Sequence, residues 1–146
     1  MQPESQVVAI GHVIQLAVAP VFLLSGVSSL LILLTNRLAR IIDRARLLEE
    51  LERQVAEPEQ SRIHAELRLL SSRARGINTA ISLGTLSALF ICAVIVALFA
   101  GAFLSTDLSV VIGIAFTAAM LALFAALISF LREVYVATRT LRIGPH

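Results

Sequence analysis

Small polar side chains interrupt two of the most apolar stretches of this chain. Their spacing by three, four and seven residues places each set on one face of a helix. The first set is Ser25, Ser29 and Asn36, and the second is Asn78, Ser82 and Thr85. In a bilayer such side chains either let helices pack closely, at about 0.6 kcal/mol per hydrogen bond, or line a water-filled path. We treat these six residues as candidates for the lining of such a path.

The charged residues that follow the first set have a helical spacing of their own. Arg37, Arg40 and Arg44 fall on one helical face, within about 60° of one another at 100° per residue. Three interpretations stay open for them: anchoring at anionic lipid headgroups, an oligomeric collar in which Asp43 and Glu66 neutralise some of them, or an anion site. Arg75 lies close to the face of the second polar set and belongs to the same predicted inner interface.

A third group, His12, Gln15 and Asp107, lies at the opposite ends of the apolar stretches. An aspartate in this position is expected to cap the helix that follows it. In a ring of copies it would also concentrate cations. His12 is expected at the membrane interface.

The chain lacks the residue patterns of an enzyme. We found no metal-ligand cluster, no nucleophile beside a base and no phosphate-binding loop, so we expect no catalytic residue, metal or cofactor. No ionisable residue lies deep in an apolar stretch, which argues against ion-coupled transport. The net charge of +2 is too small to indicate a nucleic-acid partner.

Composition places the helices that must carry these residues in a bilayer. Hydrophobic residues make up 58% of the 146 residues, and the mean hydropathy is +0.88. Three stretches without charge exceed the roughly 20 residues that a helix needs to cross. We predict an all-α integral membrane protein, one unit over 1–146, with transmembrane helices at 13–35, 77–101 and 108–131.

The arginines predict how these helices are oriented. The chain has 12 basic residues, all Arg, of which nine lie between the first and second predicted spans and three follow the third. The positive-inside rule then places the intervening segment and the tail 132–146 in the cytoplasm, with the N-terminus outside. Glu4, the absence of basic residues before the first span and the length of that span argue against a cleavable signal peptide.

Residues 36–76 have the pattern of a long antiparallel helical hairpin resembling a coiled coil, which we predict to be cytoplasmic. Apolar residues recur at steps of three and four on both sides of Pro58, where we place the turn. The predicted seam is Leu38, Ile41, Ala45, Leu48, Leu51 and Val55, then Ile63, Leu67, Leu70, Ala74 and Ile77. Ile42, Leu47 and Leu69 lie off this seam and form an apolar flank for copies or a partner.

The stretch Thr35-Asn36-Arg37-Leu38-Ala39-Arg40-Ile41-Ile42-Asp43-Arg44-Ala45-Arg46, with residues 16–26 before it, resembles the bacterial family called domain of unknown function 2721. The resemblance covers most of the chain. It implies a bacterial inner-membrane protein with three spans, and it implies no established activity.

Two functions remain open. The first is a homo-oligomeric ion channel or pore subunit, with a polar cytoplasmic vestibule and an apolar outer constriction that gates by dewetting. This requires several copies, because three helices cannot enclose a path. The second is a structural or regulatory membrane adaptor that binds a partner through the hairpin.

Overall fold

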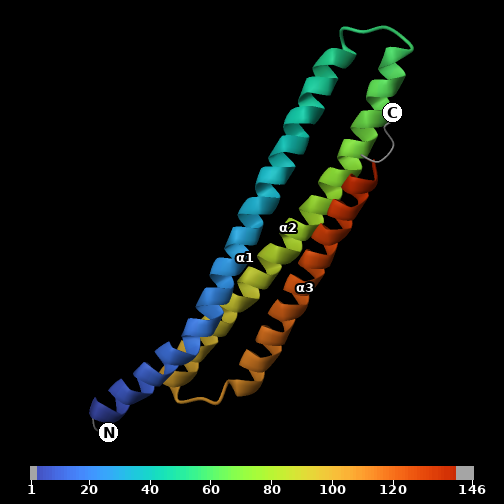
Figure 1. Ribbon diagram of the computed structural model, residues 1–146. Helices are drawn as coiled ribbons and strands as arrows, with labels where there is room; N and C mark the ends of the chain where they lie inside the picture. Colours follow the sequence, from blue (N-terminus) through green and yellow to red (C-terminus); the bar gives the residue numbers. More distant parts are fainter. Residues whose placement is uncertain (1–2, 141–146) are drawn as a thin grey trace. The chain divides into compact units, whose positions relative to one another are not determined.

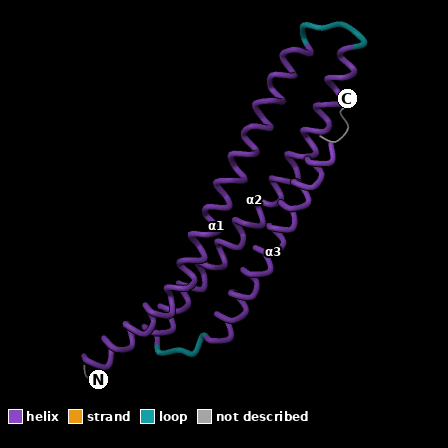
Figure 2. The backbone as a smooth tube through the Cα atoms, viewed as in Figure 1, coloured by secondary structure: helices purple, strands orange, loops and turns teal. Residues whose placement is uncertain are grey.

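The computed structural model describes residues 3–140 and is helical apart from its two loops (Figures 1 and 2). The helices are α1 (Pro3–Glu52), α2 (Glu59–Leu104) and α3 (Ser109–Thr140). Each is long and apolar enough to cross a membrane, which confirms the predicted all-α class and the count of three. Only 17% of the residues in the most apolar window of each helix are buried within the chain, so most apolar side chains face outward. Outward-facing apolar side chains suit a lipid environment.

The helix boundaries differ from the predicted spans because the helices continue past them. No break separates the first predicted span from the hairpin, since α1 runs through both. At its other end α2 runs past the predicted boundary at residue 101 and ends at Leu104. The turn is made at Ser105, whose φ is 50°. The described part of the predicted tail is helical and belongs to α3, whereas residues 141–146 lie outside the described part.

The chain divides into two compact units, and each of the three helices contributes to both. The first contains residues 1–30 and 83–124. Its buried side chains are mostly small or β-branched, including Val27, Ile91, Val94 and Ala119. Small residues allow helices to approach closely where no hydrophobic effect drives them together.

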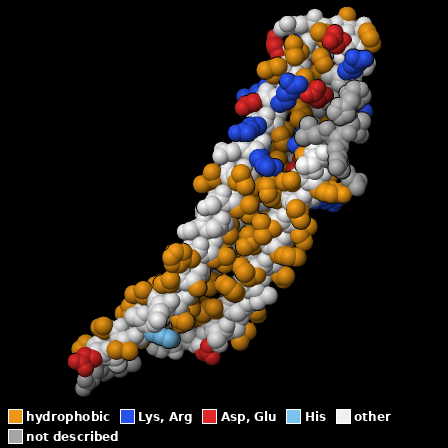
Figure 3. All heavy atoms as spheres, in the orientation of Figure 1, with side chains coloured by type: hydrophobic (Ala, Val, Ile, Leu, Met, Phe, Trp, Pro, Cys, Tyr) orange, Lys and Arg blue, Asp and Glu red, His pale blue; other side chains and the backbone are white. Residues whose placement is uncertain are grey.

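The second unit contains residues 31–82 and 125–146 and includes the predicted hairpin. The segments of α1 and α2 beside the 53–58 loop run antiparallel, since Arg44 pairs with Glu66 while the later Glu52 pairs with the earlier His64. Leu48, Ile63 and Leu70 form the core between them. In Figure 3 the visible Arg side chains and most of the visible Asp and Glu side chains lie in the upper part of the view, toward the 53–58 loop, and other acidic side chains lie at the opposite end.

Four residues of the predicted seam lie outside this core: Leu38, Leu51, Ala74 and Ile77. Leu51 is 41% exposed, because it lies in the last turn of α1, where the chain leaves the helix and the Gln54 amide donates to the Leu51 carbonyl. The predicted flank is confirmed as exposed, with Leu47 at 55% and Leu69 at 56%.

Candidate functional site

The six polar residues predicted to line a path are all exposed on the surface of the single chain. They are Ser25, Ser29, Asn36, Asn78, Ser82 and Thr85. The Ser29 and Ser82 hydroxyls each donate to the carbonyl four residues earlier, at 3.0 Å. This bond satisfies a hydroxyl within its own helix. Within residues 31–82, no described hydrogen bond joins Asn36 to Asn78 or Ser82.

A different hydroxyl packs the helices together. Ser87 is 0% exposed, and its hydroxyl on α2 donates to the Ala119 carbonyl on α3 at 2.8 Å. Ser87 lies on a different face of α2 from Ser82, because five residues separate them at 100° per residue, but its burial depends on the position of α3. The packing role considered for the six candidates is therefore carried within the chain by Ser87.

The outer group is not assembled into one site. Asp107 caps α3 as predicted: the Ser109 amide donates to its Oδ1 at 3.0 Å. His12 and Gln15 are exposed on α1, and no hydrogen bond or ion pair described within residues 3–140 joins either of them to Asp107.

The cap at Asp107 predicts a pH dependence. Hydrogen bonds from the Ser109 hydroxyl and then from the Ser109 amide lower the pKa of the Asp107 carboxyl below its ordinary value. A carboxyl with a lowered folded-state pKa adds stability above its ordinary pKa and loses it as the pH falls through the lowered value. We expect the protection of the Ser109 amide, that is, the ratio of its intrinsic to its observed hydrogen-exchange rate, to fall on acidification through that range. In Asp107→Ala this protection should be low at every pH. An identical pH profile in both proteins would contradict the cap.

The arginines of the predicted inner interface have different partners. The Arg44 guanidinium donates to Glu66 Oε1 at 3.0 Å, so Glu66 neutralises it within one chain. The Arg37 guanidinium lies 5.0 Å from the centre of the Phe130 ring, a cation–π contact between α1 and α3. The remaining members, Arg40, Asp43 and Arg75, are exposed.

A part-buried ion pair lies in the same unit, and neither of its residues was among the predicted site residues. Glu133 on α3 is only 8% exposed, and Arg73 Nε on α2 donates to its Oε1 at 3.0 Å. The second carboxylate oxygen lies against Gly76, 3.0 Å from the place where a Cβ would stand. A buried carboxylate requires such a partner, because its desolvation is otherwise costly.

A signal for this pair exists in the sequence. Glu133 is the only acidic residue after Asp107, and it follows the end of a predicted span by two residues. A lone carboxylate at that position needs a basic partner from another helix. Which arginine supplies it could not be read from spacing, because Arg73 is 60 residues away.

Gly76 provides a test of this packing. Alanine in place of glycine inside a helix gains about 1 kcal/mol from helix propensity. At Gly76 the new methyl group would press on a carboxylate that Arg73 holds in place, so we expect a net loss of about 1 kcal/mol. At Gly26 nothing lies within 4 Å of the added Cβ, and Gly26→Ala should be neutral or stabilising. Unfolding curves in detergent compare the two, and equal stabilisation by both changes would contradict the tight packing at Glu133.

A cavity of about 340 Å³ adjoins the ion pair. Its lining combines two guanidinium groups, one carboxylate and several hydroxyls. These groups belong to Ser72, Arg73, Thr79, Ser129, Arg132 and Glu133. Arg132 is exposed and makes no ion pair within the described residues.

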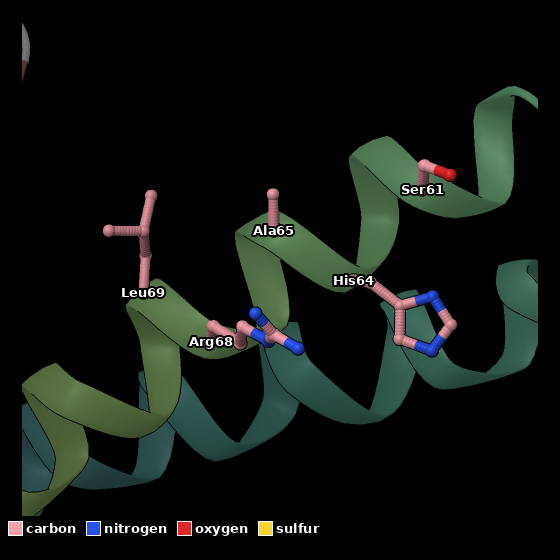
Figure 4. Close-up of a pocket in the computed structure, with 5 residues that line it drawn as sticks. All are labelled: Ser61, His64, Ala65, Arg68 and Leu69. Carbon is pink, nitrogen blue, oxygen red and sulfur yellow. The ribbon is translucent and has the colours of Figure 1, made fainter.

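A second hollow lies on the hairpin and is lined from α2 alone (Figure 4). Its His64 Nε2 lies 2.8 Å from Glu52 Oε1 of α1, so a protonated ring would form an ion pair across the hairpin. Ala65 and Leu69 point away from α1. Within residues 3–140, no three His, Cys, Asp or Glu side chains come close enough together to hold a metal ion.

Comparisons with known proteins identify a family. We found no match to the chain among curated proteins or among solved structures. A family model described as "Protein of unknown function (DUF2721)" matches residues 17–143. This match covers most of the chain, including α1 from residue 17, all of α2 and α3 and the Arg73–Glu133 pair, and the protein therefore belongs to the DUF2721 family.

Proposed function

We propose that this protein is a subunit of a homo-oligomeric ion channel, in which copies surround a water-filled path lined by the polar faces of α1 and α2. The observation that carries the proposal is the exposure of all six polar residues on the single chain. Because Ser87 carries the buried helix contact, these residues are left to face lipid, water or another copy.

The two asparagines favour water or another copy over lipid. A serine or threonine hydroxyl is satisfied by its own helix, as Ser29 and Ser82 are. An asparagine amide carries two N–H donors and a carbonyl acceptor, and a helix backbone offers no free partners for all of them. Both asparagines are exposed; Asn78 lies inside the predicted span 77–101, where hydrocarbon around it would leave polar groups unsatisfied, and Asn36 directly follows the span 13–35. A vestibule supplies water to both.

The proposed orientation places the hairpin and the C-terminal end of α3 in the cytoplasm of a bacterial inner membrane. Nine arginines lie between the first two apolar stretches, and none lies before the first or between the second and third. This asymmetry is the pattern that sets topology in multi-span proteins. The vestibule would then open inward, and the apolar stretch of α2 beyond Thr85 would form the outer constriction.

The test combines assembly with conduction. The full-length protein is purified in mild detergent, its subunit number is measured by light scattering or native mass spectrometry, and it is reconstituted into liposomes loaded with an ion-sensitive dye. We expect a ring of three or more copies and a flux above that of protein-free liposomes. A monomer, or a ring without flux for any small ion at any applied voltage, would contradict the channel.

One observation favours a second function, a membrane adaptor. Leu47 and Leu69 remain more than half exposed on the hairpin, outside its own core, and Leu69 points away from α1 (Figure 4). Exposed apolar side chains on a charged helix pair provide a surface for a partner helix. Under this function the hairpin would bind another protein at the membrane surface.

Site-directed photocrosslinking separates the two functions. A photoreactive residue is placed at Leu69 in cells, with Arg62 on the same arm of the hairpin as the matched position. The adaptor predicts crosslinks from Leu69, and none from Arg62, to a different protein. The channel predicts crosslinks to copies of this chain, and that result would contradict the adaptor.

A further inference from the structure

The cavity beside the Arg73–Glu133 pair has the polarity of an anion site. Its lining carries two guanidinium groups, from Arg73 and Arg132, against the single carboxylate of Glu133. The formal charge of the lining is therefore positive. Ser72 and Ser129 add hydroxyl donors at the same cavity.

The ion pair positions one guanidinium without using all its donors. Arg73 contacts Glu133 through Nε alone, at 3.0 Å. A guanidinium has five N–H donors, and an oxyanion accepts two of them in parallel. The two terminal nitrogens of Arg73 make no hydrogen bond among the described residues. Glu133 therefore holds Arg73 in place while its terminal donors remain available, and Arg132 supplies a second basic group.

The position of the cavity along the helices identifies the kind of anion. Thr79 and Ser129 lie inside the charge-free stretches of α2 and α3, whereas Arg73 and Arg132 lie just beyond their ends. The cavity thus lies at the border between apolar and charged helix, which is where the headgroup region of a bilayer meets its hydrocarbon. The cation–π contact between Arg37 and Phe130 brings α1 to the same border.

We propose that this cavity binds the phosphate group of a phospholipid, with Arg73 and Arg132 as its basic ligands and with the acyl chains along the apolar surface of α2 and α3. Arginine matches phosphate geometry bidentately and is preferred where desolvated phosphate is held. Basic pockets between transmembrane helices are known to bind lipid headgroups. The site does not depend on ion conduction, because its residues are distinct from the six on the polar faces.

The test measures lipid binding to the full-length protein. Native mass spectrometry in detergent compares dioleoylphosphatidylglycerol with dioleoylglycerol, which has the same chains and no phosphate. The key variant is Arg132→Ala, and the charge-matched control is Arg62→Ala on the hairpin, away from the cavity. We expect binding of the phospholipid to weaken about tenfold in Arg132→Ala and to stay unchanged in Arg62→Ala. Equal losses in both variants, or equal binding of dioleoylglycerol, would overturn the site.

Two further measurements complete the test. The double variant Arg73→Gln/Glu133→Gln removes the pair without leaving a buried charge unpaired, and it should also weaken phospholipid binding; wild-type binding in this variant would overturn the assignment of Arg73. Inorganic phosphate at millimolar concentration should leave the bound phospholipid in place. Displacement of the lipid by phosphate would identify a free anion as the ligand and overturn the lipid assignment.

Discussion

Arg73→Ala is expected to lower the free energy of unfolding by about 3 kcal/mol. The change leaves the Glu133 carboxylate buried, at 8% exposure, without the donor that now lies 3.0 Å away. Breaking a buried pair costs about 3–5 kcal/mol, and the 38% exposure of the Arg73 side chain places this case at the lower end of that range. Unfolding of the purified protein by added denaturing detergent measures the loss.

A double-mutant cycle separates the interaction energy of the Arg73–Glu133 pair from the effect of losing each side chain alone. Arg73→Gln/Glu133→Gln should be more stable than Arg73→Gln alone, because no uncompensated charge remains. The matched control is Arg44→Ala, which breaks an ion pair of the same length between side chains that are about half exposed. Exposed pairs contribute at most about 1 kcal/mol. Equal effects at Arg73 and Arg44 would show that burial of Glu133 has no energetic consequence.

Ser82→Leu/Thr85→Leu is expected to reduce ion flux in liposomes to roughly a tenth or less while the oligomer persists. Two leucines one turn apart on α2 would replace polar groups by apolar ones in every copy around the path. An apolar constriction excludes water, and the ion must then shed its hydration to pass. Flux and subunit number are measured on the same preparation.

Thr117→Leu provides the control for this variant. Thr117 is exposed on α3, and its hydroxyl donates to the Gly113 carbonyl at 2.8 Å, the same local bond that Ser82 makes. Since Thr117 is not on a predicted path, flux should remain at the wild-type level. If the double variant dissociates instead of closing, Ser82 and Thr85 hold copies together and do not line the path. A similar loss of flux in both variants would point to a general effect on the helices.

The helices were predictable because their cause is local. Charge-free stretches longer than a bilayer crossing allow only one structure in lipid, a helix that satisfies its own backbone groups. The hairpin core was also largely predictable, since the three–four spacing placed Leu48, Ile63 and Leu70 on one seam. Leu51 was assigned wrongly: the three–four spacing includes it, but it is 41% exposed in the last turn of α1.

The ion pair and the buried hydroxyl were not predictable to the same degree. Glu133 and Ser87 are buried by residues 60 and 32 positions away, so their environment depends on how α2 and α3 are rotated toward each other. Sequence spacing along one helix carries no information about that rotation. For the polar faces, spacing predicted which residues share a face of each helix, but only the structure shows that all six are exposed on the single chain.

Cysteine labelling tests most directly whether the polar face of α2 contacts water inside the assembled protein. In a Cys92→Ala background, Thr85→Cys is compared with Thr117→Cys; both positions lie nine residues inside a charge-free stretch. A charged, water-soluble thiol reagent is applied to membranes from each side. We predict rapid labelling at residue 85 and none at residue 117. A cysteine at 85 that stays as unreactive as the one at 117 would place this face in lipid and contradict the channel.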